Sequence, residues 1–201
     1  MAAAREMLDL QPTAEVSLRE LSRHVGLSKS NVVRYFPTRE AVFLAVLGED
    51  WATWLSDLQR ALPAADGRRR PEAQNHLVAA AIAQTLSEHP RFCDLLASCP
   101  SVLEHNVPIE TARAFKSAAN VNLARLAELV AARVPQLSPA EAFQFAGLTW
   151  AFTTGAWPMA NPSPVITAVL REPDFAALSI DFVAATTLAL GLLLDGFTRP
   201  R

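Results

Sequence analysis

Prolines and helix-capping residues divide this sequence into segments, and the segments have the periodicity of helices rather than of strands. Two stretches, Ser17–Glu20 and Ser138–Glu141, show the capping-box pattern, in which a Ser and a Glu three residues later satisfy the first free amides of a helix. The sequence has no sustained alternation of polar and apolar residues and no hairpin signal of the Asn-Gly or Asp-Gly type between β-branched residues. Alanine and leucine dominate the apolar residues, which also favours helix. The sequence therefore predicts an all-α fold.

The expected helices begin after capping residues and end at prolines or at Gly26. By residue number they cover 2–10, 18–25, 29–35, 39–62, 72–88, 91–97, 109–134, 139–157 and 177–197, with one further turn at 165–170. We expect an N-terminal three-helix head with a helix-turn-helix over residues 1–47. An all-helical C-terminal domain follows over residues 48–201.

Composition excludes several classes of protein. Hydrophobic residues make up 51% of the 201 residues and charged residues 19%, which excludes disorder over most of the chain. The two cysteines, Cys93 and Cys99, are too few for a disulfide scaffold. The apolar stretches Phe182–Leu194 and Ala142–Leu170 are too short, or too often interrupted by proline, to span a membrane. Because the N-terminus also lacks a signal-peptide pattern, we expect a cytoplasmic protein without membrane contact.

Motifs of the common enzyme classes are missing from the sequence. It contains no Gly-Lys-Ser/Thr phosphate loop, no Gly-x-Gly-x-x-Gly and no Gly-x-Ser-x-Gly. The four histidines do not pair with one another at i,i+4, and the two cysteines do not have zinc-finger spacing. We therefore expect no enzyme activity, no catalytic residues, no bound metal and no cofactor.

The residues from Ser17 to Arg39 fit two short helices joined by a tight turn. The first ends at Gly26, a residue type that readily adopts the left-handed backbone after a helix, and Ser28 caps the second. This is the helix-turn-helix arrangement. Its small core would consist of Leu18, Leu21, Val25, Leu27, Val32, Val33 and Phe36. Five basic residues stand against one acidic residue in this stretch, a net charge of +4, whereas the whole chain carries −2.

This concentration of positive charge suits a phosphate backbone. Amides at the start of the second helix would point at phosphates or base edges, and the short side chains of Ser28, Ser30 and Asn31 would let the helix lie deep in the major groove. Asn31 can bond adenine, and Arg34 guanine, through two hydrogen bonds each. The alternative is a helical protein-interaction module without DNA binding, whose basic face is only solvated.

The stretch Ser17–Leu47, SLRELSRHVGLSKSNVVRYFPTREAVFLAVL, resembles the DNA-binding region of the tetracycline-repressor (TetR) family of bacterial regulators. The family pattern has a Ser/Thr-started helix, then small-Gly-Val/Leu-Ser-Lys, a recognition helix ending in Phe, and Ser/Thr-Lys/Arg-Glu at the next helix start. The matching residues are Gly26, Leu27, Ser28, Lys29, Tyr35, Phe36, Thr38, Arg39 and Glu40. The resemblance implies a transcriptional regulator, most often a repressor, that binds double-stranded DNA as a homodimer and is controlled by a small-molecule effector.

The resemblance also implies which residues contact the DNA. Ser17, Thr38 and Arg39 correspond to positions that meet phosphate, and the residues on or beside the recognition helix are Ser28, Lys29, Ser30, Asn31, Arg34 and Tyr35. This sequence departs from the family at Val33, where a phosphate-contacting Tyr is common, and Arg34 can compensate for that loss. The first helix is also shorter than is usual in the family.

Two segments of the C-terminal domain, Ala142–Trp157 and Phe182–Leu194, are apolar nearly all round. A helix of this kind in a small domain must be covered on both sides. A second copy of the chain can cover the outer side, because two helices from each of two chains form a four-helix interface. Full burial within one chain is the alternative. We expect a homodimer with interface residues Phe145, Leu148, Phe152, Leu188 and Leu192.

Aromatic residues gather in and around the first of these segments. Aromatic walls with a few polar groups suit a pocket for an apolar or flat ligand, although an aromatic stripe is more often plain core. The predicted pocket residues are Phe92, Phe115, Phe143, Trp150, Thr154 and Trp157. Together with the resemblance, they predict a repressor that a small apolar or aromatic effector releases from a palindromic operator.

Overall fold

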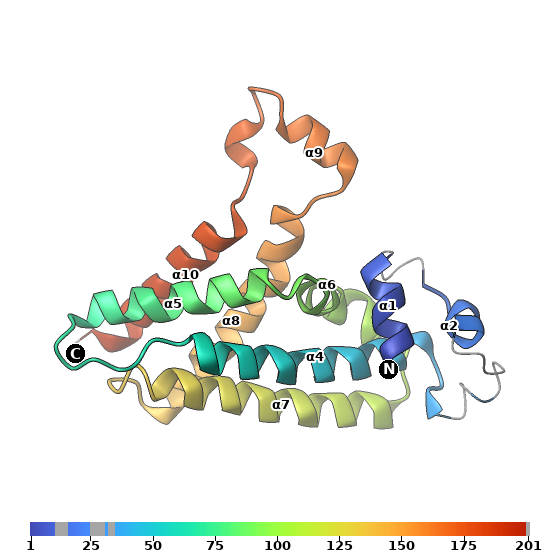
Figure 1. Ribbon diagram of the computed structural model, residues 1–201, viewed down its shortest axis with the longest axis horizontal. Coiled ribbons are helices and arrows are strands. Elements are labelled where there is room, and N and C mark those ends of the chain that lie inside the picture. The colour runs from blue at the N-terminus through green and yellow to red at the C-terminus, as the bar shows by residue number, and fades with distance from the viewer. Residues whose placement is uncertain (11–15, 25–30, 32–34, 200–201) are drawn as a thin grey trace.

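The computed structural model describes residues 1–10, 16–24, 31 and 35–199. Over these residues the chain is helical and contains no strand, which confirms the predicted all-α fold. Figure 1 shows the first two helices at one end of an elongated body and the C-terminus at the other. The helix predicted over 29–35 lies outside the described residues, apart from Asn31 and Tyr35.

The described helices agree with most of the predicted boundaries. The head holds α1 (Ala2–Leu10) and α2 (Leu18–His24), and α4 (Arg39–Ala61) leads from the head into the body. The predicted domain boundary at residues 47 and 48 falls inside α4. The body adds α5 (Pro71–Ser87), α6 (Pro90–Ser98), α7 (Ile109–Ala131), α8 (Pro139–Ala160), α9 (Pro164–Leu170) and α10 (Phe182–Thr198).

Both predicted capping boxes are present. Ser138 Oγ accepts a hydrogen bond from the Glu141 amide at 3.3 Å, and the Glu141 carboxylate accepts one from the Ser138 amide at 2.9 Å. Ser17 and Glu20 make the same two bonds, at 3.2 and 2.9 Å. Each box satisfies two of the amides that the first turn of a helix leaves free, which explains why α2 and α8 begin where the sequence predicts.

Four predicted helix boundaries differ from the structure. Helix α7 ends at Ala131, three residues before its predicted end, and α8 ends at Ala160, three residues after its predicted end. The last helix begins at Phe182 rather than at 177, because Asp181 caps it by accepting a hydrogen bond from the Ala184 amide at 2.9 Å. The chain also continues beyond α6 through Pro100, as a π-helical turn over Cys99–Leu103. Proline has no amide hydrogen, and in an α-helix its ring clashes with the carbonyl four residues earlier. The wider π turn accommodates it.

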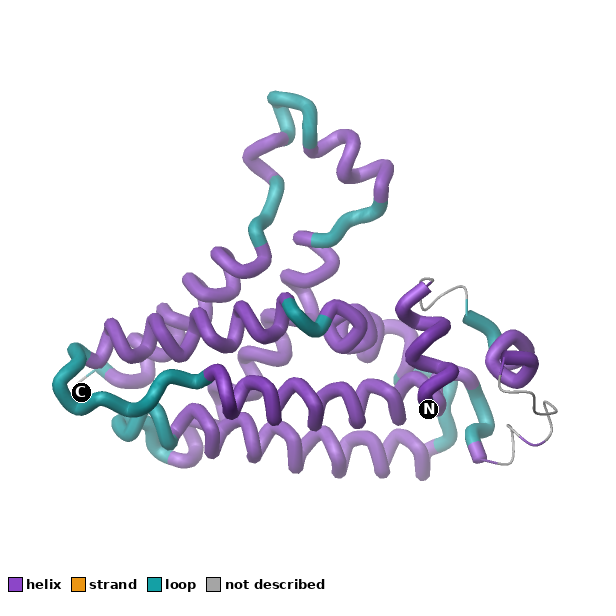
Figure 2. The backbone as a smooth tube through the Cα atoms, in the orientation of Figure 1, coloured by secondary structure: helices purple, strands orange, loops and turns teal. Residues whose placement is uncertain are grey.

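The body helices pack in two directions. Helices α4, α5 and α7 run along the body, and α10 packs most extensively on α5 (Figure 1). Helix α8 crosses behind them and contacts α6, α7 and α10 (Figure 2). Fully buried side chains on the facing sides form the core, among them Phe43, Leu47, Leu55 and Leu58 of α4, Ile82 and Leu86 of α5, and Phe145 of α8. Burying one such side chain contributes about 1.5–3 kcal/mol.

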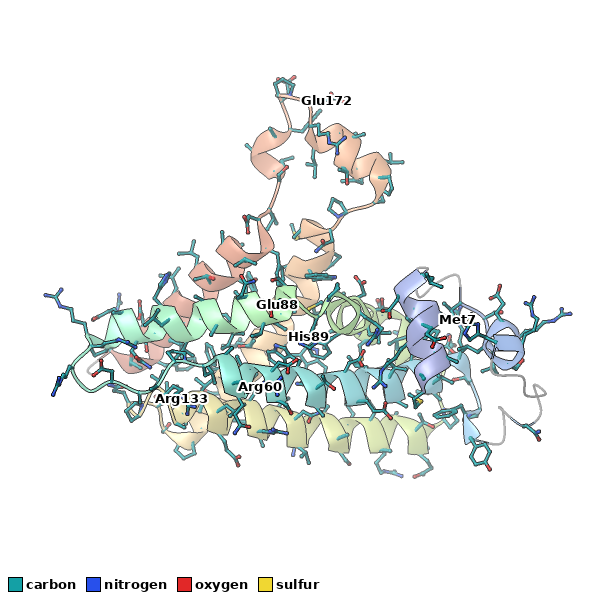
Figure 3. All side chains as sticks on the ribbon, in the orientation of Figure 1. Met7, Arg60, Glu88, His89, Arg133 and Glu172 are labelled. Carbon is teal, nitrogen blue, oxygen red and sulfur yellow. The ribbon has the colours of Figure 1, made fainter. Side chains whose placement is uncertain are left out.

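Residues 161–181, which connect α8 to α10, form an arm that stands clear of the body (Figure 3). The arm holds α9 and a 3₁₀ turn over Ala176–Leu178, and Glu172 lies at its outer end. Among the described elements, the substantial packing of α9 is on this 3₁₀ turn alone. The arm is therefore an excursion between two helices of the body and contributes little to the core of its own chain.

The two cysteines lie in the core of the body. Cys93 is on α6 and Cys99 begins the π turn, and both are free thiols with buried side chains. The Cys93 thiol donates to the Leu86 carbonyl at 3.4 Å, and the Cys99 thiol donates to the Glu104 carboxylate at 3.1 Å. Burial raises the pKa of both thiols well above the ordinary value. Both are therefore protonated and weakly nucleophilic at neutral pH.

Replacing Ser138 by alanine removes the side-chain acceptor of the α8 capping box. We expect the free energy of unfolding to fall by roughly 0.5–2 kcal/mol. Ser138→Asn, which keeps an acceptor at the cap, should lose much less. Urea denaturation of the three proteins at one fixed concentration measures the difference, and an alanine variant as stable as the natural protein would contradict it.

Candidate functional site

The turn that precedes α2 is held by Ser17. Besides its two capping bonds, Ser17 Oγ donates to the Glu20 carboxylate at 2.7 Å. These hydrogen bonds from Ser17 lower the pKa of Glu20 below its ordinary value of 4.5. A lowered carboxyl pKa means that this contribution to stability is present above pH 4.5 and is lost as the pH falls through the lowered value. The cap is therefore intact at neutral pH.

The start of α4 is tied to the segment before α2. Thr38 caps α4 by accepting a hydrogen bond from the Ala41 amide at 3.2 Å. Arg39 donates through Nη1 to the Val16 carbonyl at 3.1 Å and through Nε to the Glu40 carboxylate at 2.8 Å. Arg39 thus fixes α4 relative to the chain that enters α2.

The head has a small apolar core beneath its surface. Leu21 is buried, and Leu18 and Phe36 pack against the core with part of their surface exposed. Asn31 and Tyr35 are exposed, Tyr35 to 75%. Both of these predicted DNA-contacting side chains therefore lie at the surface of the head.

Charged side chains of three helices join the head to the body around Asp50, and we call them the charge cluster. Asp50 is buried on α4, where it accepts hydrogen bonds from Arg5 Nε of α1 at 3.0 Å and from Arg91 Nε of α6 at 2.7 Å. Arg5 also pairs with Glu49 at 2.6 Å, and Arg91 pairs with Asp9 of α1. The hydrogen bond to Asp50 raises the pKa of Arg91. Helices α1, α4 and α6 therefore meet at one carboxylate.

The charge cluster was not predicted, although the sequence contains one signal for it. Asp50 lies four residues after Val46 and four before Trp54, and both of these are buried on α4. A carboxylate on the buried face of a helix needs a cationic partner. The partners could not be assigned from the sequence because they lie 45 and 41 residues away along the chain.

Four aromatic side chains from three helices wall a small cavity in the body. Trp51 and Trp54 come from α4, Phe92 from α6 and Trp150 from α8. Trp54 and Phe92 stack with their ring centroids 5.5 Å apart, and Trp51 and Trp150 meet edge to face at 4.8 Å. The cavity volume is about 10 Å³, and its remaining lining residues are Leu86, Leu96, Leu123, Leu126, Ala146, Thr149 and Thr153.

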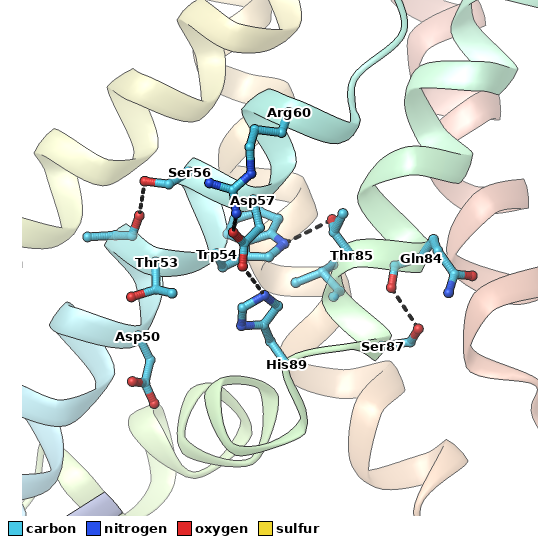
Figure 4. Close-up of polar contacts among 12 residues, drawn as sticks. Asp50, Thr53, Trp54, Ser56, Asp57, Arg60, Gln84, Thr85, Ser87 and His89 are labelled. Carbon is cyan, nitrogen blue, oxygen red and sulfur yellow. Dashed lines mark hydrogen bonds and ion pairs between the residues drawn. The ribbon is translucent and has the colours of Figure 1, made fainter. Parts of the chain in front are cut away.

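The cavity wall is almost entirely apolar, and none of its described lining residues is charged. Trp54 Nε1 donates to Thr85 Oγ1 at 3.1 Å (Figure 4). The Thr149 and Thr153 hydroxyls donate to carbonyls of their own helix. Trp51 Nε1 is buried and has no acceptor within the described part of the chain. Trp51 thus adds one unsatisfied hydrogen-bond donor to the residues around the cavity.

Helices α8 and α10 each carry a stripe of exposed, uncharged residues. The α8 stripe consists of the exposed residues Leu148, Ala151, Gly155 and Met159, and the α10 stripe of the exposed residues Ala184, Leu188, Leu192 and Gly196. Leu188 and Leu192 are each 63% exposed. A Cβ built at Gly155 or Gly196 meets nothing within 4 Å. The packing of the described chain therefore does not require glycine at either position.

Family models match the chain over residues 1–46, as bacterial regulatory proteins of the tetR family, and over residues 48–201, as a tetracyclin repressor-like C-terminal domain. The chain belongs to the tetracycline-repressor family. Among solved structures, the fatty acid degradation regulator FadR from Bacillus halodurans matches with 12% identity and a TM-score of 0.53, over 100% of this chain and 94% of that one. This likeness shows the fold alone. A comparison with curated proteins finds no match.

As a TetR-family member, the protein is a DNA-binding transcriptional regulator, as its helix-turn-helix sequence predicts. Membership of this family decides against the alternative, a helical protein-interaction module without DNA binding. Members of the family bind DNA operators, dimerise and bind small-molecule effectors, and the family domains point to a regulator rather than an enzyme. In the part of the chain that the structure describes, no helix is long and apolar enough to cross a membrane.

The structure places three of the predicted DNA-contacting residues at the turns of the TetR-family head. Ser17 and Thr38 cap helices, and Arg39 bonds to Val16 and Glu40. Ser28, Lys29, Ser30 and Arg34 lie outside the described residues. The DNA contacts of all these residues stay predictions.

Of the six predicted pocket residues, Phe92 and Trp150 line the cavity, and Trp51 and Trp54 were missed. Phe143 is exposed on α8, and Phe115 and Thr154 do not line the cavity. Trp157 lies elsewhere, where its Nε1 donates to Asp94 at 2.6 Å and its ring packs edge-on against Phe182. Helix α8 carries aromatic residues on several faces, and only the face toward α4 and α6 reaches the cavity. The missed signal was the pair of tryptophans three residues apart on the apolar face of α4.

The predicted interface residues differ in their exposure to solvent. Leu148, Leu188 and Leu192 are exposed on the uncharged stripes. Phe145 is fully buried in the core of its own chain, and Phe152 is half-buried against that core. Both of these are therefore occupied largely by packing within one subunit.

Asp50→Asn removes the charge at the centre of the charge cluster while keeping the size of the side chain. Because Arg5 and Arg91 then lose their shared counter-ion but stay partly exposed, we expect a loss of about 1–3 kcal/mol in unfolding free energy. Amides of α1 should also exchange faster with solvent. Asp57→Asn is the matched control: Asp57, also on α4, pairs with Arg60 and His89 at the body surface (Figure 4). Equal effects of the two substitutions would contradict a special role of Asp50.

Proposed function

We propose that this TetR-family regulator is a repressor that a small, uncharged apolar or aromatic effector releases from a palindromic operator. The observation that carries the proposal is the position of the cavity. Its walls include α4 and α6, and these two helices also hold the charge cluster that joins the body to α1. A change in the cavity therefore has a short physical route to the head.

The shortest connection between the cavity and the head runs through Phe92 and its neighbour in the sequence, Arg91. Phe92 lines the cavity, and the preceding residue, Arg91, bonds to Asp50 of α4 and Asp9 of α1. Because a volume of about 10 Å³ has room for one water molecule at most, an effector must widen the cavity. Widening it at Phe92 displaces the start of α6, which loosens or shifts the bonds of Arg91. Effector binding and DNA binding then oppose each other by the same factor, typically about 5–150.

The lining of the cavity limits the chemistry of the effector. A carboxylate or phosphate group would lose its hydration among lining residues none of which is charged, which is costly. Aromatic walls favour a flat or apolar molecule, and the unsatisfied Trp51 Nε1 favours one that carries a hydrogen-bond acceptor. The likeness to FadR, at 12% identity, shows the fold alone and does not indicate the effector.

Two subunits related by a two-fold axis would present two recognition helices to the DNA. The operator would then be a palindrome with half-sites roughly 34–36 Å apart, about one turn of DNA. We assign the two-fold contact to the uncharged stripes of α8 and α10. Glycine within a helix costs roughly 0.5–1 kcal/mol relative to alanine. Gly155 and Gly196 are explained if a partner backbone approaches α8 and α10 closely there.

Selection from random DNA tests the repressor head. Asn31→Ala and Arg34→Ala should relax the base preference, by roughly 1–3 kcal/mol for each lost bidentate contact. Arg39→Ala should instead weaken binding to all sequences about equally, because it removes a phosphate contact and the bond to Val16. An unchanged motif for the Asn31 and Arg34 variants would show that neither reads a base, and a single unpaired half-site would contradict the two-fold arrangement.

A thermal-shift screen with neutral aromatic compounds and with fatty acids tests the effector class, and we expect stabilisation by the neutral compounds. Trp150→Ala should abolish the response of operator binding to such a compound while leaving DNA affinity in its absence nearly unchanged. Trp51→Phe should weaken compound binding by about 0.5–1.5 kcal/mol. Phe143→Ala, on the same helix but outside the cavity, is the control. Stabilisation by fatty acids alone would contradict the proposed chemistry.

Sedimentation velocity at micromolar concentration tests the interface. Leu188→Asp should give monomers, because an unpaired carboxylate would be buried against the partner. Gly155→Ala should weaken the dimer, whereas Gly48→Ala, also at an open helical position, should not. A natural protein that sediments as a monomer would contradict the assignment.

A further inference from the structure

The wall of the cavity is thinnest between α7 and α8. Eleven described residues line the cavity, and all but two of them are buried. The two exceptions are Leu123 of α7 and Trp150 of α8, which are partly exposed to solvent. The two helices pack against each other. A molecule that passes from solvent into the cavity therefore crosses the least protein at Leu123 and Trp150.

Lys116 of α7 lies over this part of the wall. Its ammonium group is 5.7 Å from the centroid of the Trp150 ring and 5.8 Å from that of the Phe115 ring. A cation within about 6 Å of a ring centroid is attracted to the ring. Trp150 also meets Trp51 edge to face. Because the Lys116 side chain is 56% exposed and Trp51 only 2%, Trp150 separates solvent from the interior of the cavity.

The carboxylate of Glu104 holds Lys116 in this position. Glu104 Oε1 accepts a hydrogen bond from Lys116 Nζ at 2.7 Å and another from the Cys99 thiol at 3.1 Å. The Glu104 amide donates to the Cys99 carbonyl, also at 3.1 Å, and this bond closes the π turn. Glu104 is thus fixed to the π turn through both its backbone and its side chain. The ion pair of Lys116 with Glu104 joins the π turn to α7 beside Trp150.

We propose that small neutral molecules enter the cavity at Trp150, between α7 and α8, and that the ion pair of Lys116 with Glu104 holds this entrance closed. The inference rests on the proposed function, because it takes the cavity as the effector site. An outward rotation of Trp150 must break its contact with Lys116. Glu104 resists that movement because it anchors Lys116 to the π turn.

Solvent exchange of the Trp51 indole hydrogen tests the entrance without any effector. This hydrogen is buried and has no acceptor in the described part of the chain, so it exchanges when the neighbouring Trp150 moves away. Glu104→Gln should speed the exchange about two- to fivefold, because it removes one partly exposed ion pair. Lys116→Met should speed it about three- to tenfold, because the contact with the Trp150 ring is lost as well. NMR of the indole hydrogens measures these rates.

The matched control is Glu110→Gln. It removes the ion pair of Glu110 with Arg113, which lies on the same helix, is also exposed and has a distance of 2.7 Å. This variant should leave Trp51 exchange unchanged, and the Trp157 indole, which does not line the cavity, should exchange at one rate in every protein. Unchanged Trp51 exchange in the two test variants would overturn the proposal. Equal acceleration in the control would overturn it too, because the effect would then be a general loosening of α7.

Acrylamide, a small neutral quencher of tryptophan fluorescence, tests whether the entrance admits a molecule larger than water. Its quenching constant should rise in the Glu104→Gln and Lys116→Met variants and stay unchanged in Glu110→Gln. Faster Trp51 exchange without greater quenching would show that the opening admits water alone, and would overturn the proposal. If exchange and quenching both respond as expected but no neutral compound stabilises the protein, the proposed effector chemistry fails and the entrance stands.

Discussion

The attachment of the head to the body depends on the pairing of Asp50 with two arginines. Its carboxylate is buried on the inner face of α4, where it would be unfavourable alone, and Arg5 and Arg91 reach it from α1 and α6. Apolar contact also attaches the head, since Ala4 and Met7 of α1 are buried in the same core as α4, but such contact is non-directional and tolerates sliding. Hydrogen bonds between charged groups are directional and do not tolerate sliding. The charge cluster therefore sets the angle of α1 as well as its position.

Much of the helical architecture follows from local signals in the sequence. The capping boxes at Ser17 and Ser138 and the prolines near helix ends act within one or two turns, so α2, α4, α5 and α8 begin close to their predicted starts. The start of α10 was placed too early because the Ala176–Leu178 segment is apolar and alanine-rich, and the capping role of Asp181 was overlooked. The π turn through Pro100 could not be predicted, because proline usually ends a helix.

The candidate site was only partly predictable, for a physical reason. An aromatic residue on a helix is recognisable in the sequence, but whether it lines a cavity or fills the core depends on which helices face it. Trp150 and Trp157 are seven residues apart on α8, and only Trp150 reaches the tryptophans of α4. In the same way, the exposure of Leu188 and Leu192 depends on α5 covering the opposite side of α10. Such facts are properties of packing and have no local signature.

The buried thiols of Cys93 and Cys99 have a consequence for following this protein in time. Cys93 lies on α6 directly after Phe92 of the cavity wall, and Cys99 lies six residues further on, at the start of the π turn. A thiol reagent in solution cannot reach either sulfur while α6 is packed, and each becomes reactive only when the helix separates from its neighbours. The rate at which a thiol reagent labels the unmodified protein therefore reports how often α6, the helix that connects the cavity to the head, separates from its neighbours.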